Sequence, residues 1–555
     1  MLFCLKMNIL IKNGFIVDGT GTPKYKADIL VEGDTIVKIG SDLTADKAKV
    51  IDASNTIVSP GFIDIHNHGD LNIVDANKAE SFVMQGMTTL LVSVCGLGIA
   101  PANEYLTKFY KEFISRAMCA SPTIYKDFHE MRKALEEMGF SINLAFMVPH
   151  INVRSCVMEA DMRQATKEEL SKMKQIVREG MEFGAFGLST GLDYPPGSTT
   201  NTEEFIELSK VVSEYDGIYN SHMRNNGAKF IEIGMKELIR IAREAHVRAH
   251  ISHWMTLSQY NTEDLVKEAI QLVEDVRDEG LEITADVVPY DDGVTSLPFV
   301  LLNTWVFENF MVNLSNPETR KQIKKEVWER LSSAFLADAP FVIRLIPKFL
   351  LKRLAYPKIA KSVKVLHVKN NRQFLGKTMY ETLTKLYPGK KFEDSMLDFM
   401  RDEEGEVLII HMMKDEQKSV IPFYKQPFSC ASSDANLNIG GNSHPRAYGT
   451  FPRVISRWVR DMNIISLEEA IRKMTSLPAS ILQINDRGLI KEGYKADLVI
   501  FNYDLIKEMG TIENGNQFPE GIQYVIVNGE ITCKHGEHTG ALNGNVLRHP
   551  IPKGE

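Results

Sequence analysis

Short apolar runs typical of buried strands alternate with longer amphipathic stretches through most of the middle of the chain. The longer stretches, such as TEEFIELSKVVSEY and FIEIGMKELIRIAREA, place apolar residues on one face of a helix. Repeated strand and helix predicts a parallel sheet with crossover helices, whose natural closed form is a (β/α)₈ barrel. The strand-like runs are residues 61–66, 89–94, 143–148, 185–190, 217–222, 248–253, 282–287, 406–411 and 428–434.

Nine strand-like runs are one more than an eight-stranded barrel holds. The rhythm of strand and helix also breaks between about 297 and 406, which indicates an insertion. The run EVLIIH at 406–411 borders this stretch. We therefore expect EVLIIH to lie outside the barrel.

The two ends of the chain share a third pattern, in which short alternating strands are broken by Gly, Asp and Asn. It runs from 8 to 57 and returns at 495–502 and 522–532. Chain ends that look alike often pair in one sheet, so we expect both termini to form one small β-sandwich domain. The predicted class is α/β, with 1–59 and 481–555 in the β domain, 60–480 in the barrel and an insertion at about 297–406.

Composition narrows the class of partner. The chain has 555 residues, 44% hydrophobic and 25% charged, which is typical of a globular protein with a large core. Its formal net charge of −8 gives no reason to expect a nucleic-acid partner. No apolar run approaches the roughly 18 residues of a transmembrane segment. A small-molecule substrate is the remaining expectation.

The cysteines favour a reducing compartment. Six of them are scattered along the chain without C-x-x-C pairs or the spacing of a disulfide framework. The opening MLFCL before Lys6 is too short an apolar run for a signal peptide. We therefore predict a cytoplasmic location.

One segment carries charge of a single sign. Between Ala339 and Leu375 there are nine Lys or Arg residues and no Asp or Glu. Most such runs are solvated helix faces. The alternative functions for this segment are a lid over the active site or a helix that lies on a membrane surface.

Histidines recur at the carboxyl ends of the predicted strands, where α/β barrels hold their chemistry. The segment GFIDIHNH places His66 and His68 two residues apart, on one face of an extended chain. A lone His-x-His is weak evidence. However, His222 ends GIYNSH and His253 ends RAHISH.

Cys95 and Asp434 occupy two further strand ends. TLLVSV runs into Cys95 and then a Gly-x-Gly turn, while FSCASSD ends in Asp434. A buried cysteine is ordinarily a small hydrophobe, but barrel strand ends converge on one mouth. The pattern therefore predicts a metal site. His150, which also ends a strand, is expected to face the substrate or support a ligand, whereas His250 lies on the opposite face from His253 and is expected to be structural.

Longer segments carry a resemblance that covers most of the chain outside the insertion. They include VSPGFIDIHNHGD, QGMTTLLVSVCGLGIAP, GAFGLSTGLDYPPG, SSDANLNIGGNSHPRAYGTFPRV and GYKADLVIFN. Together these segments resemble the amidohydrolase superfamily and, more narrowly, the D-aminoacylases, or N-acyl-D-amino-acid deacylases. The resemblance implies a zinc-dependent hydrolase that cleaves linear N-acyl-D-amino acids into a carboxylic acid and a free D-amino acid.

The resemblance also implies a ligand set. Cys95, His222 and His253 would hold one tightly bound Zn²⁺, and His66 with His68 would complete a second, weaker position. A Cys and His donor set suits zinc. Other binuclear amidohydrolases use a carbamylated lysine, but the fourth predicted strand, AFGLSTGLDY, contains no lysine. The sequence therefore fits the branch that uses cysteine.

Proton transfer and substrate binding are assigned on the same basis. Asp434 would act as general base and then general acid. Arg446 would grip the substrate α-carboxylate, a bidentate task suited to a guanidinium. The further candidates for the substrate pocket are Tyr194, Tyr290 and Ser296.

Two features depart from the family pattern. Relatives commonly have a lysine where this chain has Met255, and neutral residues where it has Asp291 and Asp292. Both changes make the charge at the expected mouth less positive. We therefore expect N-acyl derivatives of acidic D-amino acids to be poor substrates.

Two other functions compete with this interpretation. One is a cyclic amidohydrolase that opens hydantoin-like or dihydropyrimidine rings, which the missing carbamate lysine disfavours. The other is a metal-free scaffold on the same fold, because a fold does not fix function. The presence of every ligand candidate argues against the scaffold.

Overall fold

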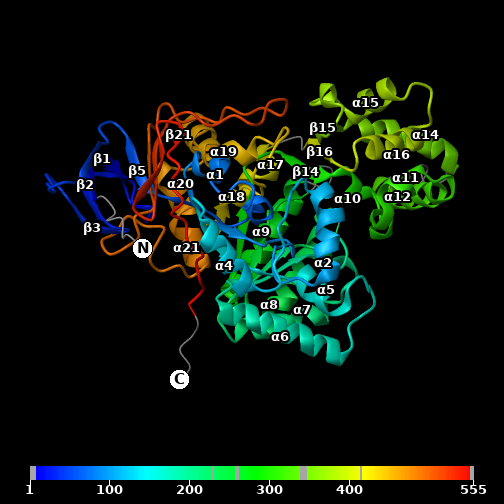
Figure 1. Ribbon diagram of the computed structural model, residues 1–555, viewed down its shortest axis with the longest axis horizontal. Helices are drawn as coiled ribbons and strands as arrows, with labels where there is room; N and C mark the ends of the chain where they lie inside the picture. The colour runs from blue at the N-terminus through cyan, green and yellow to red at the C-terminus, as the bar shows by residue number, and fades with distance from the viewer. Residues whose placement is uncertain (1–7, 228, 257–261, 338–346, 413–415, 551–555) are drawn as a thin grey trace.

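The computed structural model describes residues 8–550 except 228, 257–261, 338–346 and 413–415. At its centre lies a barrel of parallel strands (Figure 1). Its strands form two hydrogen-bonded arcs, one of β6, β7 and β8 and one of β9 to β13 with β17. The ring closes where the backbone N–H of Asp434 donates to the carbonyl of His66 at 2.9 Å. The barrel strands are β6 (Phe62–Asp64), β7 (Met87–Val92), β8 (Asn143–Phe146) continued by β9 (Val148–Pro149), β10 (Gly187–Gly191), β11 (Ile218–His222), β12 (Arg248–Ile251), β13 (Ile283–Val287) and β17 (Ser429–Ala431).

Helices cover the barrel because each presents an apolar stripe to the strands. Helix α6 is an example: Thr166 and Glu169 cap its start reciprocally, and its own residues Met173 and Val177 lie on its buried face. The helices around the barrel and its loops are α1 (Glu80–Val83), α2 (Glu104–Phe109), α3 (Ser115–Ala117), α4 (Phe128–Met138), α5 (His150–Met158), α6 (Lys167–Phe183), α7 (Thr202–Ser213), α8 (Lys236–Ala245), α9 (Glu263–Asp278), α17 (Glu416–Ser419), α18 (Ile421–Tyr424), α19 (Arg446–Arg453), α20 (Leu467–Met474) and α21 (Ser476–Ile481).

The insertion has its own small sheet, seen at the upper right of Figure 1. Strand β16 (Val407–Met412) lies between β14 (Asp292–Ser296) and β15 (Val363–Val368), antiparallel to both. The run predicted to fall outside the barrel is therefore a strand of this separate sheet. The helices of the insertion are α10 (Leu297–Leu301), α11 (Phe310–Ser315), α12 (Pro317–Ala337), α14 (Lys348–Lys361), α15 (Met379–Leu386) and α16 (Phe392–Asp402).

The basic segment contributes to this insertion, although Arg344 and its neighbours at 338–346 lie outside the described residues. Lys352 pairs with Glu393, and Lys361 lies 4.8 Å from the ring centroid of Tyr380. These contacts are internal to the insertion. Residues Lys348–Lys361 of the run form α14, whereas Val363–Val368 form β15, so a helix face accounts for only part of the basic run.

The β domain draws strands from both ends of the chain. Its sheet has the order β21-β20-β19-β18-β5-β1-β2-β3, with β4 also paired to β1. The expected sandwich is thus built as one sheet that branches at β1, around an apolar cluster that includes Ile11, Val31, Leu498 and Ile526. The predicted fold class is confirmed, while the exact domain boundaries stay a prediction. The strands are β1 (Ile9–Ile16), β2 (Tyr25–Glu32), β3 (Thr35–Gly40), β4 (Lys49–Asp52), β5 (Ile57–Pro60), β18 (Leu498–Phe501), β19 (Ile522–Val527), β20 (Glu530–Lys534) and β21 (Glu537–His538).

Within the described residues, none of the helices combines the length and apolar character needed to span a membrane.

Candidate metal centre and active site

The candidate ligands meet at the carboxyl ends of the barrel strands. His222 is the last residue of β11, and the others follow β6, β7 and β12 by two to four residues. The backbone of Cys95, His253 and Asp434 is left-handed, with φ of 54°, 33° and 47°. Non-glycine residues seldom adopt this conformation, and it clusters at functional sites. Here it is found at three positions around one centre.

Cys95 lies at the centre of the cluster. Its Sγ is 3.2 Å from Nε2 of His66, 3.9 Å from Nδ1 of His222 and 4.0 Å from Nε2 of His253. The His222 Nδ1 and His253 Nε2 atoms are 2.9 Å apart. One group of potential ligands contains His66, His68 and Cys95, and the other contains Cys95, His222 and His253. Both groups therefore share the thiol.

The charge state of the thiol suits a metal ligand. Burial opposes ionisation of Cys95, but His66 and hydrogen bonds from His222 and His253 lower its pKa well below the usual value. Burial likewise opposes the charged form of His66, yet Cys95 and Asp286 raise the pKa of His66 well above its usual value. The thiolate is the form of cysteine that binds metals.

The geometry of these residues fits a zinc ion. Zinc takes thiolate and imidazole donors at about 2.3 Å and 2.0–2.1 Å, so a tetrahedral site separates sulfur from nitrogen by roughly 3.6 Å. In the group of Cys95, His222 and His253 the sulfur–nitrogen distances are 3.9 and 4.0 Å, slightly longer than that separation, and in the group with His66 the distance is 3.2 Å, slightly shorter. The donor set and its spacing are therefore compatible with zinc.

Asp434 faces the cluster with one oxygen and Arg446 with the other. Its Oδ1 lies 3.3 Å from Nε2 of His68 and 3.5 Å from Nε2 of His66. Nη1 of Arg446 donates to Oδ2 at 3.0 Å. Burial alone would raise the pKa of Asp434, but Arg446 and His68 hold it well below its usual range. The carboxylate is therefore ionised at neutral pH and can accept a proton.

The family of the chain follows from a comparison that covers this whole cluster. The model of the amidohydrolase family matches residues 49–298 and 425–533, which make up more than half of the chain. This chain belongs to the amidohydrolase family. The interval between the two matched regions contains most of the insertion.

Individual relatives resemble this amidohydrolase over nearly their whole length. D-aminoacylase from Alcaligenes xylosoxydans xylosoxydans is 29% identical over 540 residues, 97% of each chain. N-acyl-D-glutamate deacylase from the same organism is 27% identical over 94% of this chain and 93% of its own. The solved N-acyl-D-glutamate deacylase of Bordetella bronchiseptica, complexed with zinc and a phosphonate inhibitor, has a TM-score of 0.78 at 25% identity and covers 98% of this chain and 100% of its own.

Asp286 is a residue of this amidohydrolase that the sequence pattern did not single out. It is fully buried on β13, and its Oδ2 lies 3.2 Å from Nδ1 of His66 and 3.1 Å from Nε2 of His250. Its Oδ1 accepts from the backbone N–H of His253 at 3.0 Å and from the hydroxyl of Ser432. The Asp286 carboxylate therefore contacts both groups of candidate ligands, through His66 in one group and His253 in the other.

A signal for Asp286 was available in the sequence. A carboxylate inside the strand EITADVV is buried with that strand and has to be paired. His250, expected to be structural, is one of its partners. His150 was expected to face the substrate or to support a ligand; it lies in a buried pair with Glu204, 2.9 Å away, between α5 and α7.

Tyr194 lies beside the cluster of candidate ligands. Its hydroxyl donates to the carbonyl of Cys95 at 2.7 Å, and its ring centroid is 5.3 Å from that of His222. On its other side the ring of Phe299, from α10 of the insertion, is 4.9 Å away. Tyr194 and Phe299 thus form an apolar wall next to the candidate ligands.

The side chains of Tyr290 and Ser296 have other partners. The hydroxyl of Tyr290 donates to Glu508, and the Arg453 guanidinium lies 4.5 Å from its ring centroid. The hydroxyl of Ser296 accepts from the backbone N–H of Phe299 at 3.4 Å and caps α10. Substrate contact by Tyr290 or Ser296 stays a prediction.

Asp292 adds negative charge near Arg446. Its Oδ1 lies 2.9 Å from Nε2 of His444. Burial opposes ionisation of Asp292, but His444, Arg446 and Arg453 outweigh burial and lower its pKa. Met255, the other departure noted in the sequence, is half-buried. The departures from the family pattern thus leave an ionised aspartate close to the candidate carboxylate-binding arginine.

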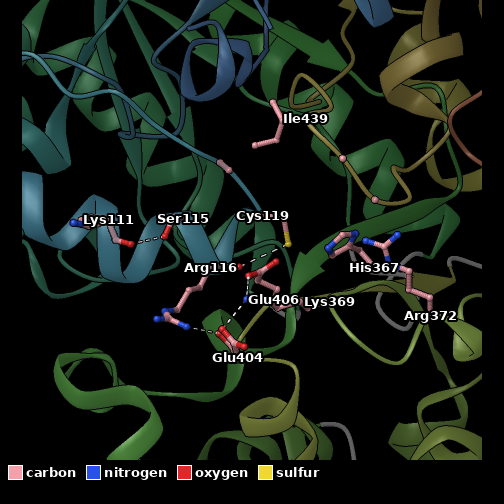
Figure 2. A pocket seen from close by; sticks show the side chains of 13 residues that line it. Lys111, Ser115, Arg116, Cys119, His367, Lys369, Arg372, Glu404, Glu406 and Ile439 are labelled. Atoms are coloured by element: carbon pink, nitrogen blue, oxygen red, sulfur yellow. Dashed lines mark hydrogen bonds and ion pairs between the residues drawn. The ribbon is translucent and has the colours of Figure 1, made fainter. Parts of the chain in front are cut away.

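A pocket of about 500 Å³ opens where the insertion meets the barrel (Figure 2). Its walls include Ile439 and Gly441, in the segment between Asp434 and Arg446, and Lys369 of the insertion. Lys369 pairs with Glu404 at 2.6 Å and Glu406 at 3.2 Å. The pocket therefore borders the segment that carries the candidate catalytic residues, and these charges in its wall are paired with each other.

Proposed function

We propose that this amidohydrolase hydrolyses N-acyl-D-amino acids to a carboxylic acid and a free D-amino acid. The observation that carries the proposal is the cluster centred on Cys95, with the ionised Asp434 facing it. The near full-length similarity to D-aminoacylase and N-acyl-D-glutamate deacylase supports the choice of substrate class. The cytoplasmic location predicted from the cysteines is part of the same proposal.

We assign zinc as the resident metal. Cys95, His222 and His253 would hold the tightly bound ion, and His66 with His68 would form a second, weaker position around the same thiol. A zinc ion held there would supply Lewis acidity for the amide carbonyl and for a water molecule, whose pKa such an ion lowers to about 7.

The chain's own residues handle the protons and the carboxylate. Asp434 accepts the water proton on Oδ1, the oxygen that faces the cluster, and then returns a proton to the departing amine. Arg446 fixes Oδ2 of Asp434 through Nη1, so Oδ1 is the oxygen presented to the water. The remaining guanidinium donors of Arg446 bind the α-carboxylate of the substrate.

Neutral or basic D-side chains fit the site better than acidic ones. Asp292 is ionised near Arg446, and Met255 supplies no compensating charge. D-aminoacylase, N-acyl-D-glutamate deacylase and N-acyl-D-aspartate deacylase are similar to this chain to nearly the same degree, at 29%, 27% and 28% identity, so the charges around Arg446 carry this choice.

A hydrolysis screen of the zinc-loaded protein tests the proposal. The substrates are N-acetyl-D-methionine, N-acetyl-D-lysine and N-acetyl-D-glutamate, their L enantiomers, and a hydantoin as the cyclic amide. We expect release of free D-methionine and D-lysine, slow release of D-glutamate and little activity on the L series. Selective opening of the hydantoin would instead establish the cyclic amidohydrolase.

A further inference from the structure

A loop of the β domain lies across the segment that carries Arg446. We call residues 502–521, between β18 and β19, the strap. In Figure 1 the strap is the orange loop that leaves the β domain and runs over the top of the barrel. Its two ends are tied together, because the backbone N–H of Asn502 donates to the carbonyl of Gly521 at 2.9 Å. The strap therefore leaves the sheet and returns to it at neighbouring positions.

The strap is hydrogen-bonded to the segment just before Arg446. Asn442 donates through Nδ2 to the carbonyl of Ile512 at 2.9 Å and accepts from the N–H of Gly515 at 3.0 Å. The N–H of Ser443 donates to Oδ1 of Asn516 at 2.8 Å. Side-chain amides on both segments thus fix the register between them.

Glycines permit the close approach of the two segments. A Cβ atom at Gly515 would lie 1.8 Å from the carbonyl oxygen of Ser443. A Cβ atom at Gly449, in the middle of α19, would lie 2.7 Å from Cγ of Glu508. Glu508 of the strap therefore packs directly against the helix that begins with Arg446.

Glu508 also holds the far end of that helix. One carboxylate oxygen accepts from the hydroxyl of Tyr290, and the other lies 3.0 Å from Nη1 of Arg453, the last residue of α19. Nε of Arg453 donates to the carbonyl of Pro289 at 2.6 Å, next to Tyr290. Glu508, Tyr290 and Arg453 thus form one clamp.

The clamp is also linked to the N-terminal end of α19, where Arg446 lies, through His444. The ring centroid of Tyr290 lies 5.0 Å from that of His444, and Nδ1 of His444 accepts from the backbone N–H of Arg446 at 3.1 Å. Both ends of α19 are therefore fixed by contacts that converge on Glu508 and Tyr290.

We propose that Glu508 is a positioning residue: through Tyr290 and Arg453, the strap of the β domain sets the place of α19 and so of the Arg446 guanidinium. The kinetic part of this inference rests on the proposed function, in which Arg446 binds the substrate carboxylate. The placement of Arg446 does not depend on the identity of the substrate.

The test uses the full chain with Glu508→Gln and Tyr290→Phe, alone and combined. For N-acetyl-D-methionine we expect Glu508→Gln to raise KM about tenfold, because carboxylate binding common to the ground and transition states is lost. A smaller fall in kcat is expected beside it, because Arg446 also holds Oδ2 of Asp434. Zinc content should equal that of the wild type. The double variant should be no worse than the worse single variant, since residues of one clamp are not additive.

Glu513→Gln is the matched control, because Glu513 is an exposed residue of the same strap. It should leave KM unchanged. Gly449→Ala provides a second perturbation: alanine is ordinarily favourable within a helix, so a raised KM would report the displaced Glu508. A KM within twofold of the wild type in both Glu508→Gln and Gly449→Ala, or additive effects in the double variant, would overturn the inference.

A crystal structure of Glu508→Gln keeps the test independent of activity. The distance from Arg446 Nη1 to Asp434 Oδ2, 3.0 Å here, is expected to exceed the hydrogen-bonding range of about 3.2 Å. If the wild type hydrolyses no N-acyl-D-amino acid but this distance still lengthens, the proposed function fails and the positioning role stands. An unchanged distance contradicts the positioning role.

Discussion

Replacing Asp286 with asparagine is expected to weaken zinc binding at the second position, to which His66 belongs, while leaving the five candidate ligands in place. The carboxylate receives the backbone N–H of His253 and the Ser432 hydroxyl on Oδ1, and it faces His66 and His250 with Oδ2. An asparagine will keep its oxygen at the first position, because two donors point there. Its NH₂ group will then face the two imidazoles.

The consequence for His66 follows from its two ring nitrogens. With an NH₂ donor at 3.2 Å, Nδ1 of His66 becomes an acceptor and the ring proton moves to Nε2. Nε2 is the nitrogen that lies 3.2 Å from Cys95 Sγ, so the ligand nitrogen is blocked. Loss of a partner of this kind typically costs 10- to 100-fold in metal affinity, or about 1.4–2.7 kcal/mol.

Competition with a chromophoric chelator measures the zinc affinity of Asp286→Asn against the wild type. Asp497→Asn is the control, because Asp497 is a buried aspartate of the β domain, paired with Arg487 and remote in the chain from the ligands. It should reduce stability without changing zinc affinity. Equal affinity of Asp286→Asn and the wild type for the more weakly bound zinc would refute the argument.

Three other variants test separate parts of the account. Asp434→Asn should retain most of its zinc and lose about 10²- to 10⁴-fold in kcat, and near-normal turnover would refute its role as the base. Arg446→Met should lower kcat/KM for all carboxylate-bearing substrates by roughly 2–4 kcal/mol, and a strong wild-type preference for N-acetyl-D-glutamate would show that the charges around it are misassigned. Burial lowers the pKa of Lys473 to about 8, so above about pH 8 the unfolded chain binds more protons than the folded one. The unfolding free energy of the wild type relative to Lys473→Met should therefore rise between about pH 8 and 10.5, by at most about 3 kcal/mol. A difference that is independent of pH in urea titrations would contradict this.

The barrel and the meeting of the ligand candidates could be predicted from local pattern. The strand-like runs recur at regular intervals, and barrel closure brings their carboxyl ends together whatever the loops do. For this reason Cys95, His222 and His253 could be expected to meet although they are far apart in the chain. The extra strand-like run could be placed outside the barrel because it borders a stretch where the rhythm fails.

The supporting contacts could not be predicted, because they depend on the register of distant segments. Tyr290 was identified as a pocket residue, but its hydroxyl direction is set by Glu508, 218 positions away. The burial of Asp286 could be predicted from the sequence, but its partners could not, because they depend on how β13 aligns with β12 and β17. Backbone conformation is equally hidden, since nothing in the residue types indicates a left-handed Cys95 or Asp434.

Zinc content and N-acetyl-D-methionine hydrolysis, measured on the same preparations of wild type and Cys95→Ala, test the central claim most directly. Cys430→Ala serves as the control, because Cys430 is a buried thiol on β17 that contacts the carbonyl of Ala285. The account predicts that Cys95→Ala loses both zinc and activity but keeps the circular-dichroism spectrum of the folded protein. Cys430→Ala should keep its zinc and its activity. A Cys95→Ala protein that is fully loaded with zinc and fully active would contradict it.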